Sequence, residues 1–342
     1  MQTVAIVALS GPGGDESSET PNPSEHRLSH NRGLFHGTQG LLDSVLGHNL
    51  LQRTIARLDE CGVARTTVVP QNPALREPLT AVSAEDSFFS AWDRAAGRAV
   101  QQGARNILVL RANQYVELDF AELIRAHVER AAGLTQVSTD QDLLDVAVIN
   151  VEKLCAAGQS FRSGLAALSP RRQRFLYRGY VNHLQKPADY MRLMEDALHL
   201  RCELRPVGTE VKPGIWLGDD ARVNDSSVLE GPCFIGSGTR IGASCKIADG
   251  CAVERGCEID SGTTIEHSWI LPGTYVGVGL NVRRSILKNN RMFHLDRRVE
   301  VTINDRRLIG SKRPRLSFGL GTGFFSKRHL AEYDHKLAST RQ

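Results

Sequence analysis

A six-residue period in the second half of the chain constrains the fold more than any other feature of the sequence. Aliphatic side chains recur at every sixth position, eleven times in one register, and a second run follows after a shift of one residue. The first run is Val211, Leu217, Val223, Leu229, Ile235, Ile241, Ile247, Val253, Ile259, Ile265 and Leu271, and the second is Ile270, Val276 and Val282. A helical or heptad period cannot give this spacing. The pattern predicts a hexapeptide-repeat parallel β-helix, in which three hexads close one coil and stacked coils bury the aliphatic column.

A second column of small residues supports this prediction. The position two before each aliphatic residue is mostly small, as in Ala221, Ser227, Cys233, Thr239, Cys245, Cys251, Cys257 and Thr263. Four of the seven cysteines fall in this column, where we expect them to pack as small apolar side chains. The cysteines are odd in number and form no Cys-x-x-Cys pair, which argues against a zinc site, a redox dithiol or a disulfide framework. We therefore expect a cytoplasmic protein.

The first half of the chain alternates between strand and helix signals. Strands are expected at Val4–Leu9, Thr66–Val69, Ile107–Leu110 and Val146–Val151, and helices at Val45–Leu58, Phe88–Gln102 and Phe120–Ala132. Short apolar strands separated by helices predict an α/β domain with a mostly parallel sheet covered on both faces. The polar segment Ser10–Thr20 is expected to be a surface loop. The resulting domains are 1–200 (α/β), 205–303 (β-helix) and 304–342 (a basic C-terminal cap or tail).

Charge and hydropathy exclude several classes of partner. The 342 residues carry 42 basic and 38 acidic side chains, a net charge of +4, which is too small to predict binding to nucleic acid or an anionic membrane. No run approaches the ~18 apolar residues of a membrane span, and the N-terminal residues resemble a strand rather than a signal peptide. Val299–Asp305 alternates like an edge strand or hairpin, and a helix is expected over Lys327–Leu337. The basic clusters Arg297–Arg298, Arg306–Arg307 and Lys312–Arg315 are expected to form a solvated cap.

Four segments resemble the sugar-1-phosphate nucleotidyltransferases, the family that includes mannose-1-phosphate guanylyltransferase. Residues 41–51 are similar to the family's stretch before its first long helix, and residues 107–113 to its strand ending in Asn-Gly-Asp. Residues 116–123 and 186–190 are similar to a helix start and to the segment that leads into the linker helix. The resemblance implies a Rossmann-like nucleotidyltransferase domain followed by a left-handed β-helix. The implied chemistry is attack of a sugar phosphate oxygen on the α-phosphate of a nucleoside triphosphate, assisted by Mg²⁺.

The residues that would carry this chemistry depart from the family pattern. The loop keeps Gly11, Gly13 and Gly14, but it places acidic residues where the family has cations. The two metal-binding carboxylates align with Asn113 and His183, which are poor ligands for Mg²⁺. The segment 85–89 replaces the base-reading loop, and too few residues separate the helix ending near 132 from the strand at 146 to hold the sugar-binding segment. The prediction is a degenerate, catalytically impaired homologue without a metal or other cofactor.

Such a homologue would act as a binding protein in nucleotide-sugar or polysaccharide metabolism. The nucleotide would be bound by Gly11, Gly13, Gly14, Arg27 and Arg111. Its expected partners are a nucleotide sugar or sugar phosphate and another subunit, either in a homo-oligomer or as an active paralogue.

Two alternative functions remain open. One is an active NTP:sugar-1-phosphate nucleotidyltransferase with a rearranged site that uses Mg²⁺. Its phosphate ligands would be Arg27, Arg32 and Arg111, with Glu117 or Asp119 near the metal, although stabilisation of a helix N-terminus is the favoured role for both carboxylates. The other is a hexapeptide acyltransferase, in which His267 or His294 acts as the base. An isolated histidine on a coil is more often a surface residue, which we favour for both.

Overall fold

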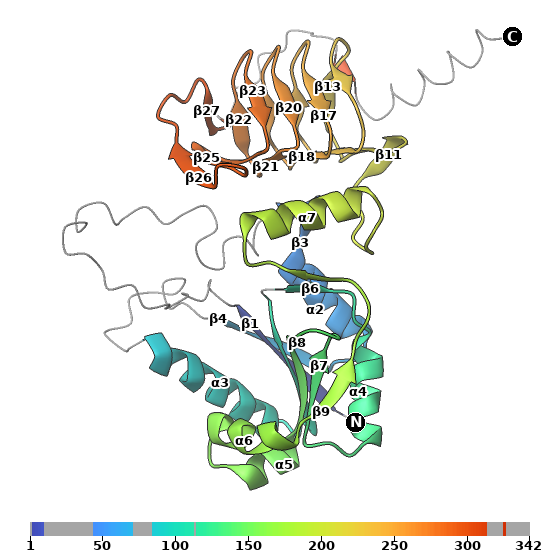
Figure 1. Cartoon of the computed structure of the whole chain (residues 1–342), viewed down its shortest axis with the longest axis vertical. Helices are drawn as coiled ribbons and strands as arrows, with labels where there is room; N and C mark the ends of the chain where they lie inside the picture. The colour runs from blue at the N-terminus through green and yellow to red at the C-terminus, as the bar shows by residue number, and fades with distance from the viewer. Residues whose placement is uncertain (1, 10–43, 71–83, 113, 313–323, 326–342) are drawn as a thin grey trace, which may run out of the picture. The chain divides into compact units, whose positions relative to one another are not determined.

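The computed structural model describes residues 2–9, 44–70, 84–112, 114–312 and 324–325, and the chain divides into two compact units (Figure 1). The first unit contains β1 and Leu51–Gln185. The second contains residues 44–50 and the described residues from Lys186 onward. The expected loop at 10–20 and the expected helix at 327–337 lie outside the described residues.

The first unit is built on a six-stranded sheet with the order β4–β1–β5–β8–β7–β9. Its strands are β1 (Thr3–Leu9), β4 (Arg65–Pro70), β5 (Asn106–Arg111), β7 (Leu134–Ser138), β8 (Leu143–Asn150) and β9 (Gln173–Leu176). β1 pairs in parallel with β4 and with β5, and β7 pairs in parallel with β9. β8 is antiparallel to both β5 and β7. The predicted α/β unit with a mainly parallel sheet is therefore confirmed. β7 was missed, and because a short turn joins it to β8 the two strands must run in opposite directions.

Helices cover both faces of this sheet (Figure 1). α2 (Leu50–Glu60) and α4 (Phe120–Glu129) lie on one face. The other face is covered by α3 (Ala84–Gln101), α5 (Val151–Ala157) and α6 (Phe161–Leu168). A short 3₁₀ turn, η2 (Ser169–Arg171), comes directly after α6. On that second face, alternate residues of β1 pack against Trp92 and Phe161, whose rings stack 5.3 Å apart. A separate two-stranded antiparallel sheet joins β6 (Gln114–Val116) to β10 (Val181–His183).

The helix expected at Val45–Leu58 is wrong in its first turn. A hairpin precedes the helix and consists of β2 (Ser44–Val45) and β3 (His48–Asn49). Leu46 and Gly47 both have positive φ, of 51° and 85°, as a two-residue type I′ turn requires. A Cβ on Gly47 would lie 2.8 Å from the Cβ of Val207, so only glycine fits there. α2 therefore begins only at Leu50.

The repeat region of the second unit, Thr209–Ser311, consists of short, mostly parallel strands in three sheets. The first sheet contains β11 (Thr209–Lys212), β12 (Ile215–Leu217), β15 (Cys233–Ile235), β18 (Cys251–Val253), β21 (Trp269–Ile270), β24 (Ser285–Lys288), β25 (Arg291–His294) and β26 (Val299–Thr302). The second contains β27 (Ile309–Ser311), β22 (Thr274–Val276), β19 (Glu258–Ile259), β16 (Arg240–Ile241), β13 (Arg222–Asn224) and β28 (Phe324–Phe325). The third contains β14 (Val228–Leu229), β17 (Lys246–Ala248), β20 (Thr264–Glu266) and β23 (Asn281–Arg283).

The register of these strands follows the aliphatic column. Ile235 pairs with Val253, eighteen residues on, which is the three hexads expected for one coil. Val253 then pairs with Ile270, only seventeen residues on, so the one-residue shift in the sequence is a coil shortened by one residue. The column residue at this level is Ile270, and the eleventh hit of the first run, Leu271, does not belong to the core cluster. The arrangement is compatible with the predicted β-helix.

Other elements cover parts of the repeat region. At one end of the sheets, β11 pairs antiparallel with β12, and β28 pairs antiparallel with β13. At the other end, β25 pairs antiparallel with β24, and β27 pairs antiparallel with β22. These added strands leave fewer open strand edges. The edge strand expected at Val299–Asp305 is confirmed as β26, which pairs with β25. The outward residues of the first sheet are buried, among them Phe234, Ala252, Trp269 and Ile286. α7 (Pro187–Leu198) packs Tyr190 on Trp269, with ring centroids 6.0 Å apart.

Candidate functional site

The carboxyl ends of β1 and β5 form the place in the first unit where a ligand site is expected. From β1 the chain crosses to β4 on one side of it, and it later returns to β5 on the other side. Crossovers that leave in opposite directions open a crevice at the carboxyl ends of the two strands, where ligands of α/β sheets bind. The ends are held together by the Ala112 amide, which donates to the Ala8 carbonyl at 2.8 Å.

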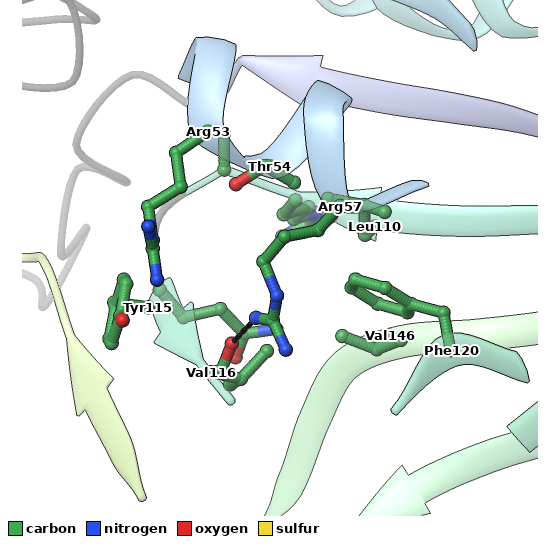
Figure 2. Close-up of a pocket in the computed structure, with 11 residues that line it drawn as sticks. Arg53, Thr54, Arg57, Leu110, Tyr115, Val116, Phe120 and Val146 are labelled. Atoms are coloured by element: carbon green, nitrogen blue, oxygen red, sulfur yellow. Dashed lines mark hydrogen bonds between the residues drawn. The ribbon is translucent and has the colours of Figure 1, made fainter. Parts of the chain in front are cut away.

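A pocket lies next to this edge, between α2, the end of β5 and β6 (Figure 2). It is lined by Arg53, Thr54, Arg57, Leu110, Arg111, Ala112, Gln114, Tyr115, Val116, Phe120 and Val146. Three of these residues are arginines, and none of the lining residues that the structure describes is Asp or Glu. The enclosed space is about 20 Å³, which is room for one water molecule or for one oxygen atom of a larger anion.

Two of the arginines come from one face of α2, because residues four apart in a helix lie one above the other. Both side chains extend from the helix into the pocket (Figure 2). The Arg57 guanidinium donates to the carbonyl of Val116 at 2.7 Å and to that of Leu118 at 3.0 Å, and it lies 5.7 Å from the centre of the Phe120 ring. Its position is therefore fixed by backbone acceptors and an aromatic face, and its charge is not paired with a carboxylate among these contacts.

Arg53 and Gln114 carry buried donors without an acceptor. The Nε of Arg53 and the Nε2 of Gln114 are both shielded from solvent, and neither has a hydrogen-bond partner in the part of the chain that the structure describes. Both residues line the same pocket. Leaving a buried donor unsatisfied costs about 1–3 kcal/mol, so such groups usually have a partner.

Two of the residues predicted from the sequence are described by the structure, one in the lining of the pocket and one beside a lining residue. Arg111 is the last residue of β5, is exposed and lines the pocket. His183 ends β10 and pairs with Gln114 of β6, so it lies beside the residue that follows Asn113. Asn113 itself lies outside the described residues, as do Gly11, Gly13, Gly14, Arg27 and Arg32.

The two carboxylates considered for a rearranged metal site have other contacts. Asp119 is the N-cap of α4, and its Oδ1 accepts from the amides of Ala121 at 2.8 Å and Glu122 at 3.1 Å. This is the favoured helix N-terminal role. Glu117 lies two residues before this N-cap, and its carboxylate accepts a hydrogen bond from the Tyr115 hydroxyl at 3.0 Å.

A divalent cation does not fit the lining of this pocket. Mg²⁺ takes oxygen ligands, mainly carboxylates and phosphates, whereas the described lining residues present guanidinium groups and amides. Among the residues that the structure describes, no three His, Cys, Asp or Glu side chains form a group suited to a metal ion.

A larger pocket of about 620 Å³ lies at the amino end of β5, and its lining contains Arg105, Asn106, His127 and Glu152. His127 is 1 % exposed, and its Nδ1 is 2.8 Å from the hydroxyl of Thr135. Burial, assisted by the nearby Lys153 charge, lowers the pKa of His127 to about 4, so the ring is neutral at physiological pH. This lining has both signs of charge and does not select a ligand class.

The second unit contains a buried acidic group, Glu254, which contacts the β2–β3 hairpin. Its carboxylate accepts from the amides of Leu46 at 2.6 Å and Gly47 at 3.0 Å, and from the Trp269 indole at 3.2 Å. The two successive amides form a concave donor pair of the kind that binds anions. Burial nevertheless outweighs these hydrogen bonds and raises the pKa of Glu254 to about 7.

Of the two histidines considered for acyl transfer, His267 is exposed and His294 is half-buried. His267 is exposed at a turn with φ of 44°, and its amide donates to the Asp249 carbonyl. His294 ends β25, and its Nδ1 accepts from the Arg297 amide at 3.5 Å. Neither imidazole is bonded to a carboxylate among the described residues, so neither has the orienting partner that a general base usually has.

The cysteines behave as predicted from the small column. Cys233, Cys245, Cys251 and Cys257 are buried in the core cluster of the repeat region, and all seven thiols are free. Burial raises the pKa of Cys233, Cys251 and Cys257 to about 12, which makes these thiols inert.

Sequence reasoning missed Arg53, Arg57, Gln114 and Glu254. The four-residue spacing of the two arginines was a usable signal, but on an amphipathic helix it is equally typical of a solvated face. A signal for Glu254 also existed, because it occupies the position after the aliphatic residue where the preceding coils have Gly218 and Gly236.

The comparisons with known proteins do not identify the chain: no family model and no curated protein matches it. Within the described ranges, no helix has both the length and the apolar character needed to cross a membrane.

Proposed function

We propose that the first unit binds a nucleotide sugar or a sugar phosphate at the carboxyl ends of β1 and β5, without metal-dependent nucleotidyl transfer. The observation that carries this proposal is the position of Arg111. It ends β5 at the switch point between two parallel strands, it is exposed, and it forms no ion pair with the described residues. A free guanidinium at this position suits a phosphate, which it can bind through two parallel hydrogen bonds.

The proposed function includes a more specific fold for each of the two units. The segments that resemble sugar-1-phosphate nucleotidyltransferases support a Rossmann-like domain of that family followed by a left-handed hexapeptide β-helix. The strand order β4–β1–β5 and the pairing of strands eighteen residues apart agree with it. The absence of catalysis is argued from charge: the described pocket offers cations, and the nearby Asp119 and Glu117 carboxylates are engaged in other contacts.

Calorimetry and an activity assay together test the proposal. Titration of the full chain with UDP-, GDP-, ADP- and dTDP-sugars should show saturable binding of at least one of them. Incubation with Mg²⁺, the four nucleoside triphosphates and common sugar 1-phosphates should release no pyrophosphate. Turnover above ~1 s⁻¹, within the ordinary range of enzymes, would contradict the loss of catalysis.

Substitution of Arg111 tests the location of the site. Arg111→Ala should weaken nucleotide-sugar binding about tenfold, the usual effect of losing a charged hydrogen-bond donor. The matched control is Arg98→Ala, because Arg98 is an exposed arginine in the last turn of α3. Equal affinities for the two variants would place the ligand elsewhere.

A further inference from the structure

We infer that the pocket beneath α2 is an oxyanion site, in which Arg53 and Gln114 donate to one oxygen of a phosphate or phosphoryl group. The inference deepens the proposed function, on which it rests for the idea that the bound group belongs to a nucleotide sugar. The chemistry of the pocket itself is independent of that idea and is satisfied equally by free phosphate.

The pocket carries an excess of positive charge among its described lining residues. Arg53, Arg57 and Arg111 line a single partly enclosed space, and the described lining contains no carboxylate to balance them. Like charges that converge in a partly enclosed space repel one another more strongly than they would in bulk solvent. An anion in the pocket would remove this repulsion, whereas a water molecule would not.

The pocket also contains two donors that have no acceptor among the described residues. The buried Nε of Arg53 and the buried Nε2 of Gln114 come from different elements, α2 and β6, and both belong to the lining of the pocket. The enclosed space of about 20 Å³ holds one oxygen atom but not a whole phosphate. A phosphate oxygen can accept both hydrogen bonds there while the rest of the group lies towards the exposed Arg111.

Arg57 has a different role from Arg53. Its hydrogen bonds to the Val116 and Leu118 carbonyls and its contact with Phe120 hold it in place before any ligand arrives. It is therefore a positioning residue that joins α2 to the β6 segment and adds charge to the pocket. Figure 2 shows the Arg53 and Arg57 side chains extending from α2 into the pocket, with a hydrogen bond drawn from Arg57 to Val116.

The experiment titrates the full chain with inorganic phosphate and with sulfate at constant ionic strength, in a buffer low in chloride. Phosphate and sulfate should both raise the melting temperature and give saturable binding by calorimetry. Arg53→Met should weaken phosphate binding about tenfold or more, because it removes a charged donor and keeps the length of the side chain. The matched control, Arg98→Met, should bind phosphate like the native chain.

Stability without the anion provides a second readout. Arg53→Met removes an unsatisfied donor and a repelling charge, so it should melt above the native chain in phosphate-free buffer. Saturating phosphate should reverse this order, because only the native chain is stabilised by binding. Phosphate affinity that Arg53→Met leaves unchanged, or the absence of any phosphate binding by the folded native chain, would overturn the inference.

The nucleotide-sugar titration separates the two proposals. If phosphate binds through Arg53 but no nucleotide sugar binds, the oxyanion site stands and the proposed function fails. If a nucleotide sugar binds equally well to the native chain and to Arg53→Met, the proposed function stands and the oxyanion site is overturned. Competition between phosphate and the nucleotide sugar, lost in Arg53→Met, is the result expected when both are correct.

Discussion

Glu254 is a carboxylic acid whose fully buried surroundings disfavour its ionised form. A fully buried carboxylate is stable only when donors surround it, and here two backbone amides and an indole supply them. The Glu254 side chain therefore accepts hydrogen bonds from the amides of the hairpin turn, while burial makes its own ionisation unfavourable. The carboxylate also acts on the buried thiol of Cys257, whose pKa it helps to raise after the larger effect of burial.

The raised pKa predicts how stability changes with pH. The pKa of Glu254 is about 7 in the folded chain against its ordinary value of 4.5, so the folded state retains the proton over this interval. Its contribution to the free energy of unfolding is therefore greatest below pH 4.5 and falls by on the order of 3 kcal/mol as the pH rises through 7. Glu254→Gln should remove this fall, as measured by urea unfolding between pH 4.5 and 8.5.

The control for this prediction is Glu230→Gln. Glu230 is half-exposed and pairs with Lys246 at 2.9 Å, so its loss should leave the pH dependence of the native chain intact. In Glu254→Gln, the NH₂ group of the new side chain faces backbone amides that are also donors, which lowers the free energy of unfolding at every pH. The test is therefore the slope of the free energy of unfolding against pH, not its value at one pH. A slope unchanged by Glu254→Gln would assign the pH dependence to other groups.

Burial also predicts which thiols react. Cys155 is exposed and Cys61 is half-buried, whereas Cys202, Cys233, Cys245, Cys251 and Cys257 are buried. A disulfide reagent at pH 8 should modify Cys155 rapidly and Cys61 more slowly in the native chain, and all seven thiols in urea. Cys155→Ser should abolish the fast phase, and Cys257→Ser should leave it unchanged. A fast phase that survives in Cys155→Ser would contradict the burial pattern.

At the scale of elements, the spacing of apolar residues predicted the strands whose positions are set by nearby sequence. The six-residue period predicted the repeat strands and even the shortened coil, because each aliphatic residue must point inward wherever its strand lies. The hairpin was missed because its turn is stabilised by Glu254, more than two hundred residues away in the sequence. The residues 45–58 alone fit a helical spacing.

Less of the candidate site could be predicted, because it too depends on contacts between segments that are distant in the sequence. Arg111 and His183 could be singled out from their motifs, and the structure pairs His183 with Gln114, the residue that follows Asn113. Arg53 becomes part of a pocket only because α2 lies beside β6, a contact that no local pattern indicates. The predicted glycine loop and its arginines remain predictions.

The aliphatic column makes a prediction for the repeat region as an element. Ile247 is completely buried in the column, and Val228, in the neighbouring strand of the same sheet, is 51 % exposed. Ile247→Ala should lower the free energy of unfolding of this region by about 2–5 kcal/mol, since it leaves a cavity between coils. Val228→Ala should change it by less than about 0.5 kcal/mol. Similar losses for the two variants in urea unfolding would contradict the inward column.

At the scale of the whole molecule, the second unit is assembled from two distant stretches of chain. Residues 44–50 belong to it, although Leu51–Gln185 form most of the first unit. The amides of Leu46 and Gly47 donate hydrogen bonds to the Glu254 carboxylate. A buried polar group of the repeat region therefore takes its hydrogen-bond donors from a segment that precedes Leu51–Gln185 in the sequence. The second unit is therefore incomplete when it is defined by the repeat region alone.

This discontinuity predicts that the effect of one substitution depends on the length of the chain. In the full chain, Glu254→Leu leaves the buried amide of Leu46 and the part-buried amide of Gly47 without their acceptor, at about 1–3 kcal/mol for the buried one, and should lower the melting temperature by roughly 5–10 °C. In a fragment that begins at Lys186 those amides are absent, so the same substitution removes a charge and should leave the melting temperature unchanged or higher. Joining residues 42–50 to this fragment through a flexible linker should restore the loss. An equal loss in the full chain and in the fragment would show that Glu254 acts within the repeat region and not through the hairpin.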